Sequence, residues 1–140
     1  MADEKKGDFM EKTIKFNVVF GVTAGYEGLQ SPDQVNLGEV MAKAAAAWQE
    51  AAAAEFAKSG LYISAVAAPA AAVYHTDWGC PVGGEIAVSF EGTANPQFVN
   101  DIDMWKHAVI RVVTEVKTKL KQSTTTLEFS EVNDFYYITD

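Results

Sequence analysis

The sequence predicts an α+β fold in which one antiparallel sheet carries two helices on the same face. Two kinds of observation predict this class. Short segments with alternating apolar residues are typical of strands, and two long segments combine helical apolar periodicity with capping residues. Their order, strand-helix-strand-strand-helix-strand, is that of the split βαβ or ferredoxin-like arrangement. At 140 residues the chain has the size of one domain. We expect a disordered tail over 1–12 and a single α+β domain over 13–140.

The first predicted strand begins at Thr13 and alternates to Val22, with five apolar residues on one face: Ile14, Phe16, Val18, Phe20 and Val22. A long loop over 23–35 follows, and loops of this length in small domains often serve a function. Its spacing of glycines matches neither common phosphate-binding motif. We therefore interpret the loop as a cover over a pocket, to which Tyr26 would contribute.

The first helix is predicted from Leu37 to Ser59. Asn36 can cap its start together with Glu39, and Gly60 suits the position after its end. The predicted buried stripe contains Leu37, Met41, Ala45, Trp48, Ala52 and Phe56.

Two further strands, over 61–73 and 85–93, form a predicted hairpin. Pro69 places the first of them at a sheet edge, a bulge or a break, because proline donates no ladder hydrogen bond.

The second helix is predicted over 102–122, with Asn100 or Asp101 as its cap and His107 on its solvated face. Its buried stripe contains Ile102, Trp105, Val109, Val112, Val116 and Leu120. Basic residues gather toward its end, where the helix dipole favours cations; an anion-binding or subunit-docking face is the alternative. The segment 123–139 favours strand, either one bent strand or two short strands that turn at Asn133-Asp134.

The net charge of −8 disfavours nucleic acid and anionic membranes as partners. The sequence contains no apolar run long enough for a membrane span, and the charged first residues do not resemble an export signal. A lone cysteine fits a reducing compartment, so we expect a cytoplasmic protein.

The segment Tyr74–Glu85 is the strongest candidate for a functional site, because it concentrates reactive and aromatic side chains in one turn. Three kinds of chemistry are compatible with it. Cys80 could be a nucleophile with His75 as base and Asp77 as its orienting partner. Glu85 and Asp77 could act as acid and base beside aromatic residues. These four polar residues could also ligate zinc or iron, although one cysteine and one histidine are a weak metal signal, and we assign no metal. The predicted catalytic residues are His75, Asp77, Cys80 and Glu85, and the predicted ligand-binding residues are Tyr26, Tyr74 and Trp78.

The order of elements and the aromatic hairpin segment Val73–Gly79 resemble those of the divalent-cation tolerance proteins and of their relatives, the nitrogen-regulatory signalling proteins. Both groups are trimers of split βαβ units, so the resemblance implies a homo-oligomer. The segment Gly60–Ser64 departs from that family because it holds no cysteine. The resemblance assigns no functional residue to this chain.

We therefore predict a homo-oligomeric domain that binds a small ligand or regulates a partner. The alternatives are a small enzyme, either a cofactor-independent isomerase or a thiol-dependent one, and an assembly module without a pocket. Trp78 would serve as a contact residue in such an assembly. The sequence identifies no cofactor.

Overall fold

Four strands form one antiparallel sheet in the order β2-β3-β1-β4. The computed structural model describes residues 10–23 and 28–140. The strands are β1 (Met10–Gly21), β2 (Val66–Ala72), β3 (Glu85–Thr93) and β4 (Leu127–Tyr136). β1 and β3 occupy the centre, and each pairs with the other and with one edge strand. Pro69 lies in β2, which is an edge strand, so the edge is the one of the three predicted alternatives that the structure shows.

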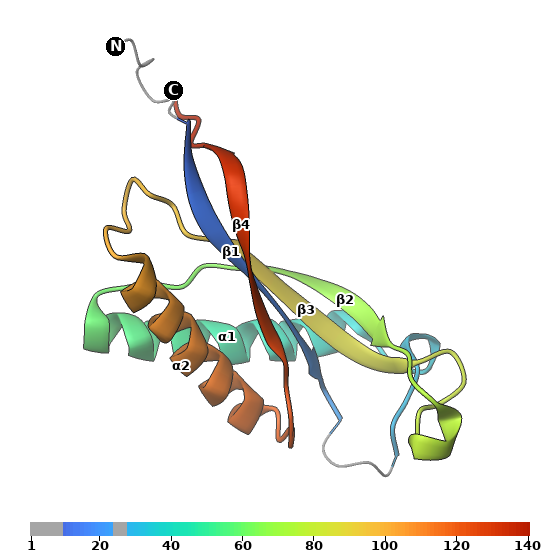
Figure 1. The fold of residues 1–140 in the computed structure, drawn as a ribbon. Coiled ribbons are helices and arrows are strands. Elements are labelled where there is room, and N and C mark those ends of the chain that lie inside the picture. Colours follow the sequence, from blue (N-terminus) through green and yellow to red (C-terminus); the bar gives the residue numbers. More distant parts are fainter. Residues whose placement is uncertain (1–9, 24–27) are drawn as a thin grey trace.

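Two helices, α1 (Leu37–Ser59) and α2 (Ile102–Lys119), cover one face of the sheet (Figure 1). α1 connects β1 to β2 across β3, and α2 connects β3 to β4 across β1. These two crossovers confirm the ferredoxin-like arrangement that the order of segments predicts. No helix in the described part of the chain is long and apolar enough to cross a bilayer.

Local capping fixes the helix boundaries. The Asn36 side chain accepts a hydrogen bond from the Glu39 backbone N–H at 3.1 Å, and Gly60 ends α1 in the left-handed conformation. Asp101 caps α2 by accepting from the Met104 N–H at 3.1 Å. The predicted bounds of α1 and β3 agree with the structure. α2 ends three residues before the predicted Gln122, because the chain turns back after Leu120.

A row of stacked aromatic rings joins the sheet to both helices. Trp48 of α1 stacks between Phe16 and Phe90, with ring centroids 5.6 and 4.6 Å apart, and Phe16 also contacts Trp105 of α2. The indole N–H of Trp48 donates to the Ile63 carbonyl at 2.9 Å. The segment before β2 is thereby held against α1, and it does not pair with the sheet as predicted for 61–65.

The buried face of α1 differs from the predicted stripe. Leu37 and Phe56 are 39% and 53% exposed, and Phe56 packs edge to face on Tyr62 instead of entering the core. The face that is buried contains Ala44, Trp48, Ala51, Ala52 and Glu55. This face meets α2, where Arg111 donates hydrogen bonds at 2.9 and 2.8 Å to the buried Glu55 carboxylate.

The bounds of the two terminal strands differ from the prediction: β1 is longer, whereas β4 covers only part of the predicted segment 123–139. β1 begins at Met10, so residues 10–12 of the expected tail belong to this strand, in which Met10 and Glu11 pair with β4; residues 1–9 lie outside the described part. β4 is one continuous strand through Asn133 and Asp134. The pairing register shifts there, with Glu11 opposite Phe135 and Thr13 opposite Val132. A β-bulge therefore takes the place of the turn that these two residues suggest.

Candidate functional site

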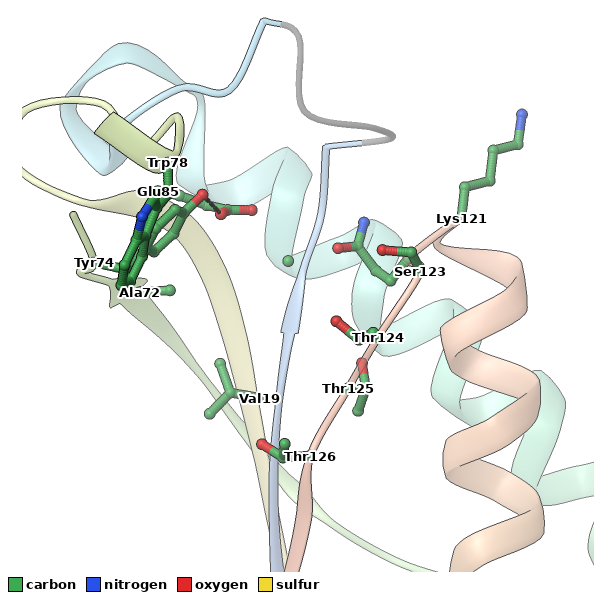
Figure 2. A pocket seen from close by; sticks show the side chains of 12 residues that line it. Val19, Ala72, Tyr74, Trp78, Glu85, Lys121, Ser123, Thr124, Thr125 and Thr126 are labelled. Carbon is green, nitrogen blue, oxygen red and sulfur yellow. Dashed lines mark hydrogen bonds between the residues drawn. The ribbon is translucent and has the colours of Figure 1, made fainter. Parts of the chain in front are cut away.

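A cavity of about 670 Å³ lies at the end of the sheet where β1 and β2 end and β3 begins. This volume is within the range of small-molecule sites. The segment between α2 and β4, Lys121–Thr126, forms the opposite wall; we call it the α2–β4 segment. Figure 2 shows Tyr74, Trp78 and Glu85 on one side and the serine and threonine residues of this segment on the other, with Val19 between them.

Strand register brings Glu85 and Tyr74 together. Glu85 begins β3 and pairs with Ala72, the last residue of β2, so the chain leaving β2 carries Tyr74 over the Glu85 side chain. The Tyr74 hydroxyl donates a hydrogen bond to Glu85 Oε1 at 2.7 Å. This bond fixes the carboxylate in the cavity wall.

Gly21, the last residue of β1, allows two polar side chains to meet beside the cavity. A Cβ atom at this position would lie 2.6 Å from Gln122 Oε1 and 2.7 Å from Glu85 Oε2. The amide of Gln122 also donates to the Thr23 and Leu120 carbonyls, each at 3.0 Å. Glu85 and Gln122, which are far apart in the sequence, thus converge over the backbone of Gly21.

The α2–β4 segment begins with a tight closure of the helix end. The N–H of Lys121 donates to the Thr118 carbonyl and the N–H of Gln122 to the Lys117 carbonyl, each at 3.0 Å. Lys121 has φ of 57° and is the one non-glycine residue in the described part with a positive φ. These features define a Schellman motif, in which glycine usually occupies the position of Lys121.

Trp78 lines the cavity, and His75 lies behind it in the same turn. The turn is a short 3-10 helix, η2 (Thr76–Trp78), which the His75 side chain caps by accepting the Asp77 N–H at Nδ1, 3.0 Å away. The His75 ring contacts the Trp78 ring with centroids 5.6 Å apart. Nδ1 of His75 is therefore occupied by a local backbone contact.

Cys80 is buried beneath the hairpin end. Its Sγ lies 3.6 Å from the Ala72 carbonyl oxygen and 3.4 Å from that of Pro81, so the thiol is oriented by backbone acceptors. Among residues 10–23 and 28–140, no group of three or more His, Cys, Asp or Glu side chains is arranged to hold a metal ion. The structure therefore does not gather His75, Asp77, Cys80 and Glu85 into one set of ligands.

The predicted site residues fall into three groups. Tyr74, Trp78 and Glu85 line the cavity, whereas His75, Asp77 and Cys80 are not among its described lining residues. Tyr26 lies outside the residues that the structure describes.

Sequence reasoning missed the residues that other segments bring to the cavity, which are Gly21, Gln122 and the α2–β4 segment. Two signals in the sequence point to them in retrospect. A glycine, Gly21, lies on the face opposite the apolar residues at the end of the first strand, and a cluster of four hydroxyl residues, Ser123–Thr126, follows the second helix.

The charges of the cavity are one carboxylate and one ammonium. Within the described lining, Glu85 and Lys121 are the two charged side chains, and they belong to opposite walls. Aromatic rings lie beside the carboxylate, and the hydroxyl residues Ser123–Thr126 follow Lys121 along the other wall. This arrangement suits a ligand that has an aromatic part, a cationic centre and an anionic end.

Comparison with known proteins identifies one family and two similar structures. The SAM lyase family model matches residues 11–138. A phage SAM lyase in the apo state matches over 100% of this chain and 97% of its own, with 12% identity and a TM-score of 0.56. A phage SAM lyase in complex with S-methyl-5'-thioadenosine matches over 99% and 97%, with 13% identity and a TM-score of 0.51. The search of curated proteins finds no match.

The matching family is neither of the two that the order of elements resembles. Many families share a βαββαβ order, which positions strands and helices without selecting an activity.

Proposed function

Because this chain belongs to the SAM lyase family, we propose that it is an enzyme that cleaves S-adenosylmethionine and releases S-methyl-5'-thioadenosine. The observation that carries the proposal is the cavity wall in which the Glu85 carboxylate, fixed by Tyr74, lies beside Trp78. The similar phage structure with bound S-methyl-5'-thioadenosine supports the choice of product. This proposal favours an enzyme over the regulatory domain that the sequence suggests first.

The chemistry of the substrate fits these side chains. S-adenosylmethionine carries a positive charge on its sulfonium sulfur, and a carboxylate or an aromatic face attracts such a cation. We assign Glu85 to the sulfonium, Tyr74 to the orientation of Glu85, and Trp78 to a stacking surface for the adenine ring.

The proposed reaction breaks the bond between the sulfonium sulfur and the γ-carbon of the methionine part. The bonding electron pair moves to sulfur, so that the thioether product is neutral. The four-carbon fragment balances this charge in one of two ways. Either its own carboxylate closes on the γ-carbon to give a lactone, or a β-proton leaves to give an alkene. Neither route consumes water, and Glu85 accepts a proton only in the second.

The test is to incubate the purified protein with S-adenosylmethionine and identify the products by liquid chromatography and mass spectrometry. We expect S-methyl-5'-thioadenosine together with a lactone or an alkenyl amino acid. Glu85→Gln should lower kcat/KM by roughly 100-fold or more, because the bound sulfonium loses its charge partner. Tyr74→Phe should lower it by about tenfold, because the carboxylate loses one hydrogen bond.

The matched control is Glu91→Gln, which makes the same change on the same strand at an exposed residue that contacts Lys15. Cys80→Ser and His75→Ala test the thiol mechanism that the sequence left open. Normal activity in Glu85→Gln, combined with loss of activity in those two variants, would replace our assignment by the thiol mechanism. Absence of S-methyl-5'-thioadenosine with the unmodified protein would refute the proposed function itself.

We also propose that the chain forms a homo-oligomer through the face of the sheet opposite the helices. Strand register places small uncharged residues side by side on that face, with Ala68 opposite Ser89 and Ala70 opposite Ala87. Such a surface permits close approach of a second copy. Light scattering coupled to size-exclusion chromatography tests this proposal, and a monomer at micromolar concentration would contradict it.

A further inference from the structure

The α2–β4 segment closes the end of α2 and leads into β4, and two of its features are not explained by that role. The first is Lys121 itself. An L-residue in the left-handed conformation is strained relative to glycine, and the Schellman motif at this position favours glycine. The lysine side chain is exposed at the rim of the cavity and, within the described residues, has no ion-pair partner. The backbone geometry therefore does not account for a lysine here.

The second feature is the hydroxyl of Thr125. Its Oγ1 atom is buried and has no hydrogen-bond partner within the described residues, although the side chain lines the cavity. A buried hydroxyl without a partner is costly and therefore rare, so its presence in a cavity wall calls for a functional explanation. Lys121 and Thr125 are thus two donors without an acceptor on the same wall, opposite Glu85 (Figure 2).

The helix end behind these donors does not repel an anion as strongly as an open helix C-terminus would. The carbonyls of Lys117 and Thr118 accept backbone hydrogen bonds from the turn, and the Leu120 carbonyl accepts the Gln122 amide. Carbonyl groups that are already hydrogen-bonded contribute less exposed negative charge. An anion at the α2–β4 segment would therefore meet an ammonium group and a free hydroxyl donor.

We propose that Lys121 and Thr125 bind the carboxylate of the amino-acid part of the substrate and thereby discriminate in favour of substrates that carry it. This inference rests on the proposed function. It deepens that function because S-adenosylmethionine has its charges in the same order as the cavity: an aromatic base, a sulfonium cation and, at the far end, a carboxylate. With Trp78 and Glu85 fixed on one wall, the carboxylate extends toward the other. The flexible stem of Lys121 lets its ammonium group follow the ligand.

The experiment compares three ligands that differ in this one group. S-adenosylmethionine carries the carboxylate, decarboxylated S-adenosylmethionine lacks it, and S-methyl-5'-thioadenosine lacks the whole amino-acid part. KM for S-adenosylmethionine and Kd for the other two, the latter by titration calorimetry, are measured in wild type, Lys121→Gln and Thr125→Val. Lys117→Gln is the control, because it removes the same charge from the last turn of α2 outside the cavity lining.

Lys121→Gln should raise KM for S-adenosylmethionine by about fivefold, as expected for a partly exposed ion pair. Thr125→Val should raise it by a similar factor of about fivefold through loss of one hydrogen bond. Kd values for the two ligands without a carboxylate should change by less than about twofold in both variants. Lys121→Arg and Thr125→Ser keep the charge and the hydroxyl, and they should restore most of the affinity for S-adenosylmethionine.

Two results would overturn the inference, and they are distinguishable from failure of the proposed function. Equal weakening of all three ligands would show that Lys121 and Thr125 shape the loop without contacting the carboxylate. Unchanged KM in both variants would show that the carboxylate binds elsewhere. If wild type neither converts S-adenosylmethionine nor binds S-methyl-5'-thioadenosine, the proposed function fails, and the inference fails with it.

Discussion

The substitution Gly21→Ala should lower catalytic activity while leaving the stability of the fold nearly unchanged. Gly21 has no positive φ, so alanine fits its backbone conformation without strain. The new methyl group would lie 2.6 Å from Gln122 Oε1 and 2.7 Å from Glu85 Oε2. Both oxygens are at the ends of flexible side chains, and they must retreat by about 0.8 and 0.7 Å, respectively, to reach ordinary contact at 3.4 Å. The substitution therefore displaces the two polar groups and leaves the strand intact.

The expected magnitudes follow from this geometry. A displacement of about 1 Å in a catalytic group can cost about 100-fold in rate, so we expect kcat/KM to fall by roughly 10- to 100-fold. Replacement of glycine by alanine in a compatible conformation adds about 0.4–1 kcal/mol of stability through the unfolded state. The side-chain rearrangement offsets part of this gain. The free energy of unfolding should therefore change by less than about 1 kcal/mol.

Gly92→Ala is the matched control in the neighbouring strand β3. There the methyl group would lie 2.5 Å from the Ser64 backbone oxygen and 2.7 Å from Cε2 of the buried Phe16 ring. Neither atom can retreat easily, so overpacking should cost about 1–3 kcal/mol. Urea denaturation gives the stability of each variant, and release of S-methyl-5'-thioadenosine gives its activity. Wild-type activity in Gly21→Ala, or a loss of stability equal to that of Gly92→Ala, would refute the reasoning.

Three further predictions concern the helices, the turn and the thiol. The hydrogen bonds from Arg111 lower the pKa of Glu55 below its ordinary value of 4.5, against the opposing effect of burial. Glu55 thus contributes stability above about pH 4.5 that is lost as the pH falls through its folded-state pKa. The difference in Tm between wild type and Glu55→Gln, measured by circular dichroism melts, should therefore shrink below that pH. A difference in Tm that stays constant with pH would contradict this. Lys121→Gly should stabilise the fold by about 1 kcal/mol, because glycine adopts the left-handed backbone conformation of this position without strain. An unchanged or lowered Tm would show that the lysine backbone is not strained there. Cys80 should react with iodoacetamide far more slowly in the native protein than in urea, since the residue is 5% exposed; equal rates would show an open thiol.

The fold was largely predictable because its determinants are local. The Asn36 cap and Gly60 fixed α1, the apolar alternation fixed β3, and Pro69 indicated an edge strand. The rotation of α1 was not predictable from its own residues. The buried face of α1 includes Glu55, whose partner Arg111 is brought to it only by the packing of the two helices.

The candidate site was predictable in part for the same reason. Tyr74, Trp78 and Glu85 lie in one hairpin, whose concentration of aromatic and polar residues is visible in the sequence. Gln122 and Gly21 join them through strand pairing and a helix end, and neither position carries a recognisable motif. Closeness in the sequence was misleading for His75 and Cys80, because the η2 turn and backbone carbonyls engage their polar atoms separately.

The two outer strands differ from the interior strands in a way that bears on aggregation. Unpaired backbone groups along an outer strand can recruit further chains and extend a sheet without limit. β2 carries Pro69, and β4 carries the exposed acidic residues Glu128, Glu131 and Asp134. Both features discourage strand-by-strand growth into fibres. Addition of further strands is therefore disfavoured at both edges of the sheet.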